Sequence, residues 1–269
     1  MKEQTSPVRV QGQYGKDGIE LVQWDQAGRA RSLDVAIRIS GPGITPSYLI
    51  GDNSGLLTSD AIRAHLIKAY AAATDTPLAQ ATEQAAHALT LLDVDLDRVS
   101  VSVRARTWDP IEGVYQPRTW VDTALLECTR HGGTWQQESA AQGFAELALL
   151  SPGGSSFTGF KRDSLLQQAD IADRPMNGRL TAEWSLKGSG IALENSAVVH
   201  TVRTAVGTTA SNSFQHLLHC VGSIVLATHE QLDVIRLRFD SSPLTPHSPG
   251  TFEIRDRGTG ITEATVRRP

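Results

Sequence analysis

The sequence has little cysteine and no long hydrophobic run. Its two cysteines, Cys128 and Cys220, lie far apart, with no CxxC motif and no His/Cys cluster. This pattern indicates neither a disulfide framework nor a structural zinc site, and it fits a reducing compartment. No apolar run approaches the roughly 18 residues that a membrane-spanning helix needs.

Recognisable targeting segments are also missing. The first residues, MKEQTSPVRV, lack the apolar core of a secretory signal, and the final residues, VRRP, are not a peroxisomal tripeptide. We therefore expect a cytoplasmic protein that has no membrane partner.

The charges show no strong bias of one sign. The net charge is −4 and no segment concentrates Lys and Arg, so nucleic acid is not an expected partner. Hydrophobic residues make up 40% of the chain and charged residues only 20%, which predicts a folded core rather than disorder. A length of 269 residues is sufficient for one large domain or two fused small ones.

The common catalytic signatures are absent as well. The sequence contains no GxGxxG turn, no Walker loop, no HExxH and no GxSxG. Dinucleotide and nucleotide cofactors, zinc-dependent hydrolysis and serine hydrolysis therefore become poor explanations of its function.

The first half of the chain shows strands, then helices, then strands. Period-two alternation and β-branched residues predict strands, and an Ala-rich stretch broken at Thr76 and Pro77 predicts two helices. The predicted strands are 18–24, 32–39, 98–108 and 118–130, the helices lie within 59–92, and the turn between the last two strands is 109–113.

The second half predicts a similar order. Residues 178–186 and 197–208 are expected to form a hairpin, and residues 211–232 a long helix with a cap at Ser211, Asn212 or Ser213. That helix has one apolar stripe: Phe214, Leu217, Leu218, Val221 and Val225. Strands are then expected at 232–240 and 251–256, separated by a Pro-rich loop at 241–250.

These elements indicate an α+β protein. The order strand, strand, helix, strand, strand occurs twice, with helices on one face of an antiparallel sheet. We accordingly predict two halves, residues 1–143 and 144–269.

Four segments of the sequence resemble segments of a known protein family. YGKDGIELVQW, beginning at Tyr14, resembles the YGKDxVRV segment of the urate oxidase (uricase) family. GDNSGLLTSDAIR, residues 51–63, is similar to that family's ADNSxxxATDSIK. SSFTGFKRD, residues 155–163, with the later Asp173 and Arg174, resembles SQFxGFxRD followed by DR. SFQHLLHCVGSIVLA, residues 213–227, is similar to the SVQATMYxMAxxIL helix. The four segments occur in the family's order.

The resemblance implies a fold and a reaction. The fold would be a tandem T-fold, two antiparallel sheets each backed by helices, which assembles into a barrel-like homotetramer with active sites at subunit interfaces. The reaction would be oxidation of urate by dioxygen to 5-hydroxyisourate and hydrogen peroxide. No metal or flavin would take part, and dioxygen would be the co-substrate.

The resemblance also implies a set of substrate-binding residues. Phe157 matches the Phe that stacks on urate, Arg174 the Arg that forms two parallel hydrogen bonds with the anion, and Gln215 the amide that reads the pyrimidine edge. The backbone of Phe214 would also face the substrate, although the family usually has Val there. Each of the first three also has an ordinary alternative. Phe157 could be a core residue, Arg174 a solvated cation and Gln215 a polar residue of the first helical turn.

The same family uses a proton relay of Lys, Thr and His. Lys16 matches the Lys, Ser59 falls at the Thr position, and Asp60 matches an Asp whose backbone N–H contacts substrate. Ser59 keeps the hydroxyl that the relay needs. Thr58 is adjacent, and the same stretch is also a good helix cap, so two registers are open.

The third relay member has two possible positions. The family carries an NxH motif, whose Asn helps to hold dioxygen or water above the ring. An ungapped count places Ser241 and Pro243 there and deletes the His. If the Pro-rich loop is an insertion, Thr245 and His247 take these positions, and this is the placement we favour.

Two other functions are open. The chain could bind another purine or a pterin-like ring, or it could be a non-catalytic paralogue in a mixed assembly. Enzymes of the wider T-fold group that act on pterins anchor the ring with a Glu, and Glu183 and Glu194 are the candidates here.

Overall fold

The computed structural model describes residues 12–157, 171–187, 193–211, 213–242, 244–248, 251–254 and 260–268. Only the backbone is described for residues 152–157, 171–175, 244–248, 251–254 and 260. The chain divides into two compact units: residues 1–116 with 124–140, and residues 117–123 with 141–269.

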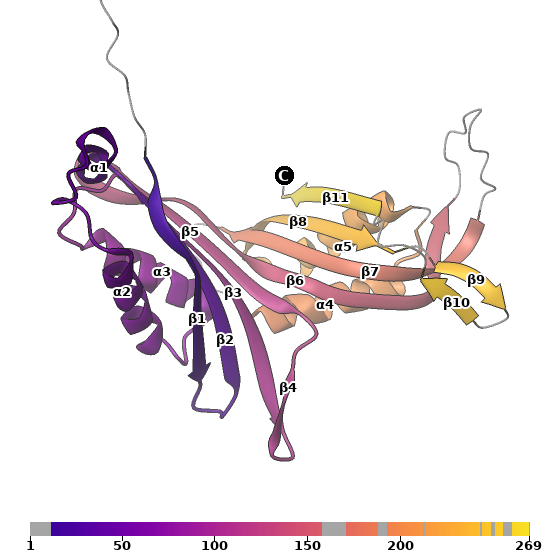
Figure 1. The fold of residues 1–269 in the computed structure, drawn as a ribbon. Coiled ribbons are helices and arrows are strands. Elements are labelled where there is room, and N and C mark those ends of the chain that lie inside the picture. Colours follow the sequence, from indigo (N-terminus) through magenta and orange to yellow (C-terminus); the bar gives the residue numbers. More distant parts are fainter. Residues whose placement is uncertain are drawn as a thin grey trace, which may run out of the picture. The chain divides into compact units, whose positions relative to one another are not determined.

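The first unit consists of antiparallel strands whose one face is covered by two helices (Figure 1). Its elements are β1 (Tyr14–Trp24), β2 (Ala30–Ser40), η1 (Pro42–Ile44), α1 (Thr45–Ile50), α2 (Ser59–Ala71), α3 (Leu78–Thr90), β3 (Arg98–Ile111), β4 (Val114–Pro117) and β5 (Val121–His131). Strand β6 (Thr134–Phe157) begins in this unit and continues into the second.

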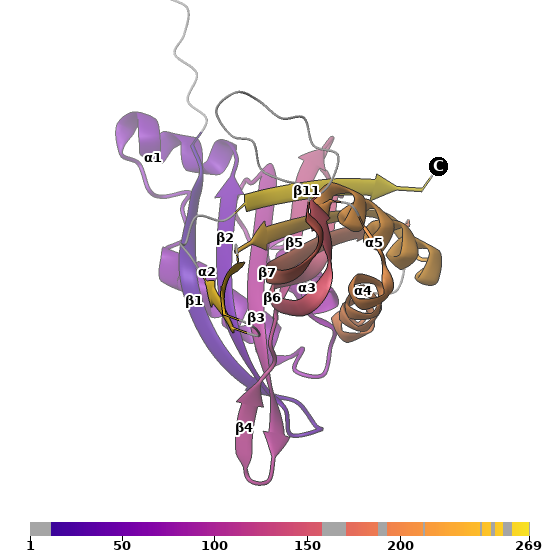
Figure 2. The ribbon, with the colours of Figure 1, turned by 90° about the vertical axis from the view of Figure 1, so that its right-hand side faces the viewer.

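The second unit repeats this plan, with two helices against one face of the sheet (Figure 2). Its further elements are β7 (Ile171–Leu186), α4 (Asn195–Thr208), α5 (Phe214–Thr228), β8 (Leu232–Ser241), β9 (Leu244–Ser248), β10 (Thr251–Ile254) and β11 (Gly260–Arg267). Among the described residues, no helix has the length and apolar character required to cross a membrane.

The strands form one large sheet rather than the two that we expected. Hydrogen bonding gives the order β1-β2-β3-β5-β6-β7-β8-β11, with β4 paired to β3, and a separate pair of β9 and β10. The reason is β6, which is 24 residues long and pairs with both β5 and β7. Its sequence, rich in Ala, Gly, Ser and Gln, has little strand propensity, and we did not predict most of it.

Each unit has its own hydrophobic core between sheet and helices. In the first, the inward residues of β1, β2 and β3 pack against α2 and α3; Ile37, Val101 and Leu66 are among its buried members. In the second, β7 and β8 pack against α4 and α5, with Trp184 and Val221 buried. The predicted stripe of α5 is confirmed: Leu217, Leu218, Val221 and Val225 are all buried.

The prediction of a strand at 197–208 is wrong, because this segment is helix α4. Its Val and Thr residues favour strands by intrinsic propensity, but here they lie in a helix that packs against the sheet. The buried residues Val198, Val199, Val202 and Ala205 lie at i, i+1, i+4 and i+7, which is a helical stripe. The hairpin partner of β7 is therefore β6.

Two connections also differ from the prediction. The turn expected at 109–113 is confined to Glu112 and Gly113, both with positive φ, while Asp109, Pro110 and Ile111 belong to β3. Part of the Pro-rich loop at 241–250 is strand β9, which pairs with β10.

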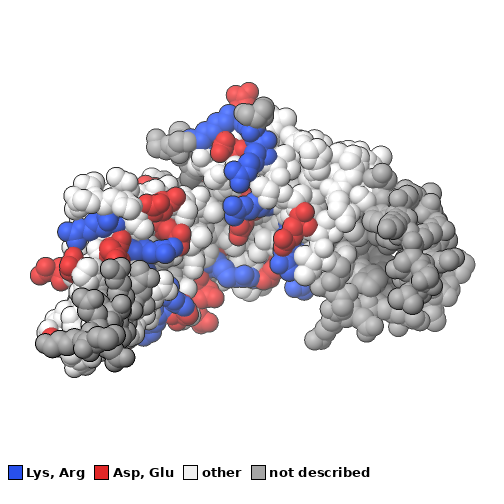
Figure 3. All heavy atoms as spheres, turned by 90° about the horizontal axis from the view of Figure 1, so that it is seen from above, with Lys and Arg blue, Asp and Glu red and all other residues white. Residues whose placement is uncertain are grey.

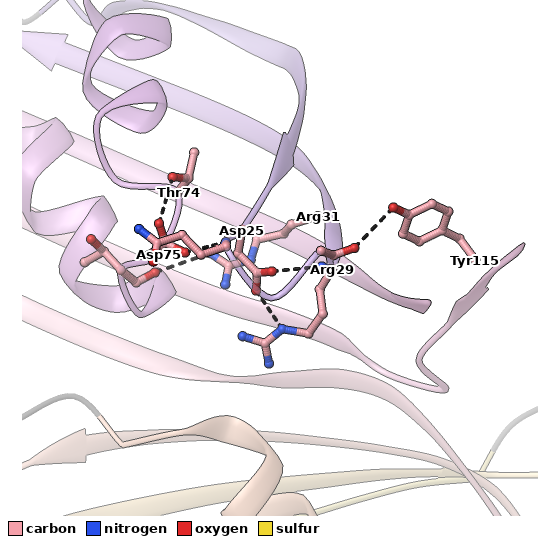
Figure 4. Close-up of polar contacts among 9 residues, drawn as sticks. Asp25, Arg29, Arg31, Thr74, Asp75 and Tyr115 are labelled. Carbon is pink, nitrogen blue, oxygen red and sulfur yellow. Dashed lines mark hydrogen bonds and ion pairs between the residues drawn. The ribbon is translucent and has the colours of Figure 1, made fainter. Parts of the chain in front are cut away.

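Polar contacts fasten the β1–β2 turn of the first unit to its neighbours (Figure 4). The Asp25 carboxylate accepts hydrogen bonds from Arg29 N at 2.8 Å and Arg29 Nε at 2.6 Å. Gln26 N donates to Asp75 Oδ1 at 2.7 Å, and Tyr115 Oη donates to the Gly28 carbonyl at 3.1 Å. These contacts connect the turn to the α2–α3 loop and to β4.

Charged side chains of both signs lie next to one another on the face shown in Figure 3. Ion pairs also connect neighbouring strands of the sheet, such as Arg98 with Glu127 at 2.9 Å and Arg238 with Glu263 at 3.4 Å. These pairs are exposed, so each contributes little to stability by itself.

Candidate functional site

The nine candidate residues divide between the two units. Lys16, Ser59 and Asp60 lie in the first unit, on β1 and at the start of α2. The other six lie in the second unit, on four elements: Phe157, Arg174, Phe214, Gln215, Thr245 and His247.

Lys16 lies next to a β-bulge in strand β1. Lys16 pairs with Ile37 and Ile19 pairs with Val35, so Asp17 and Gly18 together face the single residue Ala36. Gly18 has φ +64°, a conformation that glycine adopts without strain. Because paired residues share a face of the sheet, Lys16 lies on the side of the buried Ile37, which is the side covered by α2 and α3.

From that side, Lys16 reaches the first turn of α2. Its Nζ lies 2.8 Å from Asp60 Oδ1, with 33% of the Lys16 and 81% of the Asp60 side chain exposed. The hydrogen bond from Lys16 lowers the pKa of the Asp60 carboxyl, and the positive charges of Lys16 and Arg63 act in the same direction. The carboxylate also suits the positive end of the helix macrodipole.

The helix cap is Thr58, not Ser59. Thr58 Oγ1 accepts a hydrogen bond from Ala61 N at 3.2 Å, whereas Ser59 is the first helical residue. Within the part of the chain that the structure describes, the Ser59 hydroxyl has no hydrogen-bond partner. The two hydroxyls therefore differ in role, and Ser59 keeps a hydroxyl beside Asp60 that is not required for capping.

The loop before α2 is held by its own polar groups. Helix α1 ends at Gly51, with φ +70°, and Asp52 Oδ1 accepts a hydrogen bond from Ser54 N at 2.9 Å. A β-carbon on Gly55 would lie 2.6 Å from the Gly43 carbonyl oxygen, so only glycine fits there. The DNSG stretch thus sets the direction from which α2 begins.

In the second unit, Phe157 and Arg174 lie on paired strands. Arg174 on β7 pairs with Ser155, and Phe157 pairs with Ile171. The register shifts on both sides of Ser155. The backbone therefore brings the two positions to the same end of the β6–β7 pair. The side chains of both residues lie outside the described part, as do residues 158–170, which include the rest of the SSFTGFKRD segment.

Gln215 lies in the first turn of α5. Ser213 caps this helix, accepting a hydrogen bond from His216 N at 3.2 Å, which confirms one of the three predicted caps. The Phe214 ring packs edge-on against Phe239, with centroids 5.0 Å apart. Gln215 is exposed, close to the free N–H groups of the helix start, where an anion is favoured.

Thr245 and His247 both belong to β9. Thr245 pairs with Glu253, while the register shifts so that His247, between Pro246 and Ser248, has no paired residue on β10. The bulge thus falls at the candidate His. The alternative position Ser241 is the last residue of β8, and Pro243 lies outside the described residues.

The two candidate ring anchors are far from equivalent. Glu183 is exposed in the middle of β7, opposite Arg236, and Glu194 is the N-cap residue of α4, without a capping hydrogen bond from its side chain.

Across the described residues, no group of three or more His, Cys, Asp or Glu side chains has the geometry to hold a metal ion.

Sequence reasoning missed the residues around Lys16. The Asp17 carboxylate pairs with both terminal nitrogens of Arg38. The available signal was Gly18, because a glycine within a strand is typical of a bulge; the predicted strand 18–24 started at this glycine, whereas β1 continues through it.

Comparison by sequence finds relatives over most of the chain. The uricase of Arthrobacter globiformis is 24% identical over an alignment 284 residues long, gaps included. The alignment covers 98% of this chain and 91% of that protein. The uric acid degradation bifunctional protein of Bacillus sp. (strain TB-90) is 24% identical over 76% of this chain, and the match spans 45% of that longer protein. No protein-family model matches the chain.

Solved structures share the fold. The chain superimposes on the crystal structure of the uricase from Arthrobacter globiformis with a TM-score of 0.81 at 23% identity, covering 98% of this chain and 96% of that one. For the urate oxidase of Bacillus sp. TB-90, the TM-score is 0.84 at 20% identity, with 96% and 100% covered.

These structures define the class: an α+β protein with the tandem T-fold of the uricases. The sequence match to the Arthrobacter uricase runs almost end to end. By sequence and by fold, the chain is similar to the uricases over nearly its whole length.

Proposed function

We propose that the protein oxidises urate with dioxygen, without metal or flavin, to 5-hydroxyisourate and hydrogen peroxide. The strongest support is the match to the Arthrobacter uricase over 98% of the chain. The contact of Lys16 with Asp60, next to the Ser59 hydroxyl, adds local support.

The binding roles follow from the chemistry of urate, a flat monoanion with hydrogen-bond groups around its rim. Phe157 stacks on the ring face, and Arg174 donates two parallel hydrogen bonds to the anionic edge. Gln215 reads the opposite edge, and the backbone N–H groups of Phe214 and Asp60 complete the contacts. The start of α5, where Gln215 is exposed, favours a bound anion.

The proton steps fall to Lys16, Ser59 and His247. The Ser59 hydroxyl takes a proton from urate as it gives its own proton to the Lys16 amine. Lys16 and His247 pass protons onward to the reduced oxygen, and Thr245 holds dioxygen or water above the ring. The balance is urate plus dioxygen plus water giving 5-hydroxyisourate plus hydrogen peroxide. Urate loses two electrons and dioxygen gains them.

The site would be completed by a second copy of the chain. Lys16, Ser59 and Asp60 belong to the first unit, whereas the ring-binding residues and His247 belong to the second. In this proposal Lys16, Ser59 and Asp60 of one copy face Phe157, Arg174 and Gln215 of its partner, in a homotetramer.

The test is urate consumption by the purified, metal-stripped protein in air, followed by the loss of near-ultraviolet absorbance and the appearance of peroxide. We expect one peroxide for each urate consumed. Consumption that requires added metal would contradict the proposal. Binding of a urate analogue without turnover would favour the alternative, a protein that binds a purine or pterin-like ring without oxidising it.

Arg174→Ala tests the binding role. Loss of a desolvated charge-assisted pair weakens urate binding by on the order of 2 kcal/mol, or about 30-fold, measured by titration with a non-reacting analogue. Arg179→Ala is the matched control, because Arg179 is exposed on the same strand. Equal affinities in the two variants would remove Arg174 from the site.

A further inference from the structure

The β-bulge at Asp17 and Gly18 determines which face of the sheet Lys16 occupies. In a regular strand, Lys16 and Ile19 would lie on opposite faces, because their separation is an odd number of residues. Here both lie on the helix-covered side, since Lys16 pairs with the buried Ile37 and Ile19 with the buried Val35. The extra residue makes this possible.

The burial of β1 depends on the same shift. Ile19 and Gln23 are buried on the helix side, while Glu20, Val22 and Trp24 are exposed on the other. Moving Lys16 to the helix side without the bulge would turn these buried residues outward. The core of the first unit and the position of Lys16 are therefore compatible only through the bulge.

Asp17 and Arg38 hold the bulge from the opposite face. Arg38 belongs to the face of β2 that points away from the helices, because its neighbours Ile37 and Ile39 are buried. Its two terminal nitrogens donate to the two oxygens of Asp17, and one of them also donates to the Ile37 carbonyl at 2.8 Å. A planar fork fixes a carboxylate in direction as well as distance.

The electrostatics agree with this geometry. The hydrogen bond from Arg38 lowers the pKa of the Asp17 carboxyl, and Asp17 in turn raises the pKa of Arg38. Both groups are thus charged at neutral pH. Asp17 of this pair lies directly after Lys16 in β1, and the Lys16 side chain contacts Asp60 at 2.8 Å on the other face.

We propose that the Asp17–Arg38 pair is a positioning device for Lys16: it locks the bulge that directs the Lys16 amino group to the Ser59–Asp60 end of α2. The catalytic consequence rests on the proposed function, in which Lys16 is part of the proton relay. Asp17 and Arg38 touch neither substrate nor reacting atoms in this account.

The decisive variant is Arg38→Lys, which keeps both charges and removes the fork. Asp17→Asn removes the charge, and the exchange Asp17→Arg with Arg38→Asp restores a fork with reversed polarity. The matched control is Asp95→Asn. The Arg130–Asp95 pair has side-chain exposures of 38% and 62%, close to the 44% and 60% of Arg38 and Asp17.

The first measurement is independent of activity. The rate of Lys16 acetylation by an amine-reactive reagent is followed by mass spectrometry, with exposed Lys68 of α2 as the internal reference. We expect severalfold faster labelling of Lys16 in Arg38→Lys and Asp17→Asn, recovery in the exchanged pair, and no change in Asp95→Asn. Unchanged labelling in Arg38→Lys would overturn the positioning role.

The second measurement is urate turnover. Misplacing Lys16 lowers kcat by about tenfold or more, while KM stays within about twofold, because the ring-binding residues are untouched. If the wild type consumes urate and Arg38→Lys behaves like Asp95→Asn, the positioning role is wrong and the function stands. If the wild type does not consume urate, the proposed function is wrong, and the labelling rates still decide whether the Asp17–Arg38 pair positions Lys16.

Discussion

Thr58 and Ser59 show how two adjacent hydroxyl residues can have different roles. From sequence alone, either could cap α2 and either could match the family's Thr. The structure assigns the cap to Thr58, whose oxygen accepts a hydrogen bond from Ala61 N. Ser59, one residue into the helix, is the remaining candidate for the relay.

This division predicts opposite results for two alanine variants. Thr58→Ala should lower the free energy of unfolding by about 1 kcal/mol, the usual effect of losing an N-cap, and leave kcat for urate nearly unchanged. Ser59→Ala should leave stability nearly unchanged and remove most of the turnover. Thermal unfolding measures the stability of both variants, and steady-state kinetics measures their kcat for urate. If Thr58→Ala instead loses turnover while Ser59→Ala keeps it, the relay hydroxyl is that of Thr58.

Residue-scale prediction failed where the position of a side chain depends on a distant partner. Lys16 could be named from its YGKD segment, but its contact with Asp60 joins residues 44 positions apart. The Asp17–Arg38 pair was not predicted for the same reason. The placements of Phe157, Arg174, Thr245 and His247 stay predictions at the side-chain level, because only their backbones are described.

At the scale of elements, α5 was predictable and α4 was not. Both helices bury a stripe, but α5 carries Leu, Phe and His, whereas α4 is rich in Val and Thr. Burial against the sheet overrides the strand propensity of β-branched residues. The helical spacing of Val198, Val202 and Ala205 contained the correct signal.

Two helical glycines distinguish propensity from packing. A β-carbon on Gly222 of α5 would lie 2.6 Å from Val266 Cγ2 of β11, whereas one on Gly207 of α4 would meet nothing within 4 Å. Gly207→Ala should therefore raise the free energy of unfolding by about 0.5–1 kcal/mol through helix propensity. Gly222→Ala should lower it by about 1–3 kcal/mol through overpacking.

Denaturant unfolding of both variants tests this difference. Combining Gly222→Ala with Val266→Ala should give a coupling energy that favours the pair, because the shortened side chain leaves room for the added methyl. Stabilisation by Gly222→Ala alone would mean that α5 does not approach β11 as closely as the structure shows.

At the scale of the whole molecule, the distribution of candidates over two units leads to a test of assembly. If relay and binding residues of one site come from different copies, two inactive variants should complement each other. A mixture of Lys16→Met and Arg174→Ala chains, unfolded and refolded together, should regain about a quarter of wild-type turnover, because half of the dimers are mixed and each has one intact site.

Separately refolded variants, mixed only afterwards, are the control for this experiment. Failure to regain turnover after co-refolding, with tetramers present by light scattering, would place all site residues within one copy. The homotetramer and the division into halves at residues 143 and 144 both stay predictions.

The α+β class, four strands of the first unit, its helix pair, the α5 stripe and the family resemblance could all be predicted from the sequence, because local periodicity and short segments encode them. The folded chain was needed to show that β6 joins the strands into one sheet and that Lys16 faces α2. Each of these depends on register or close packing between residues far apart in the chain. A one-residue bulge changes the face of a side chain, and only the pairing with β2 shows where that bulge falls.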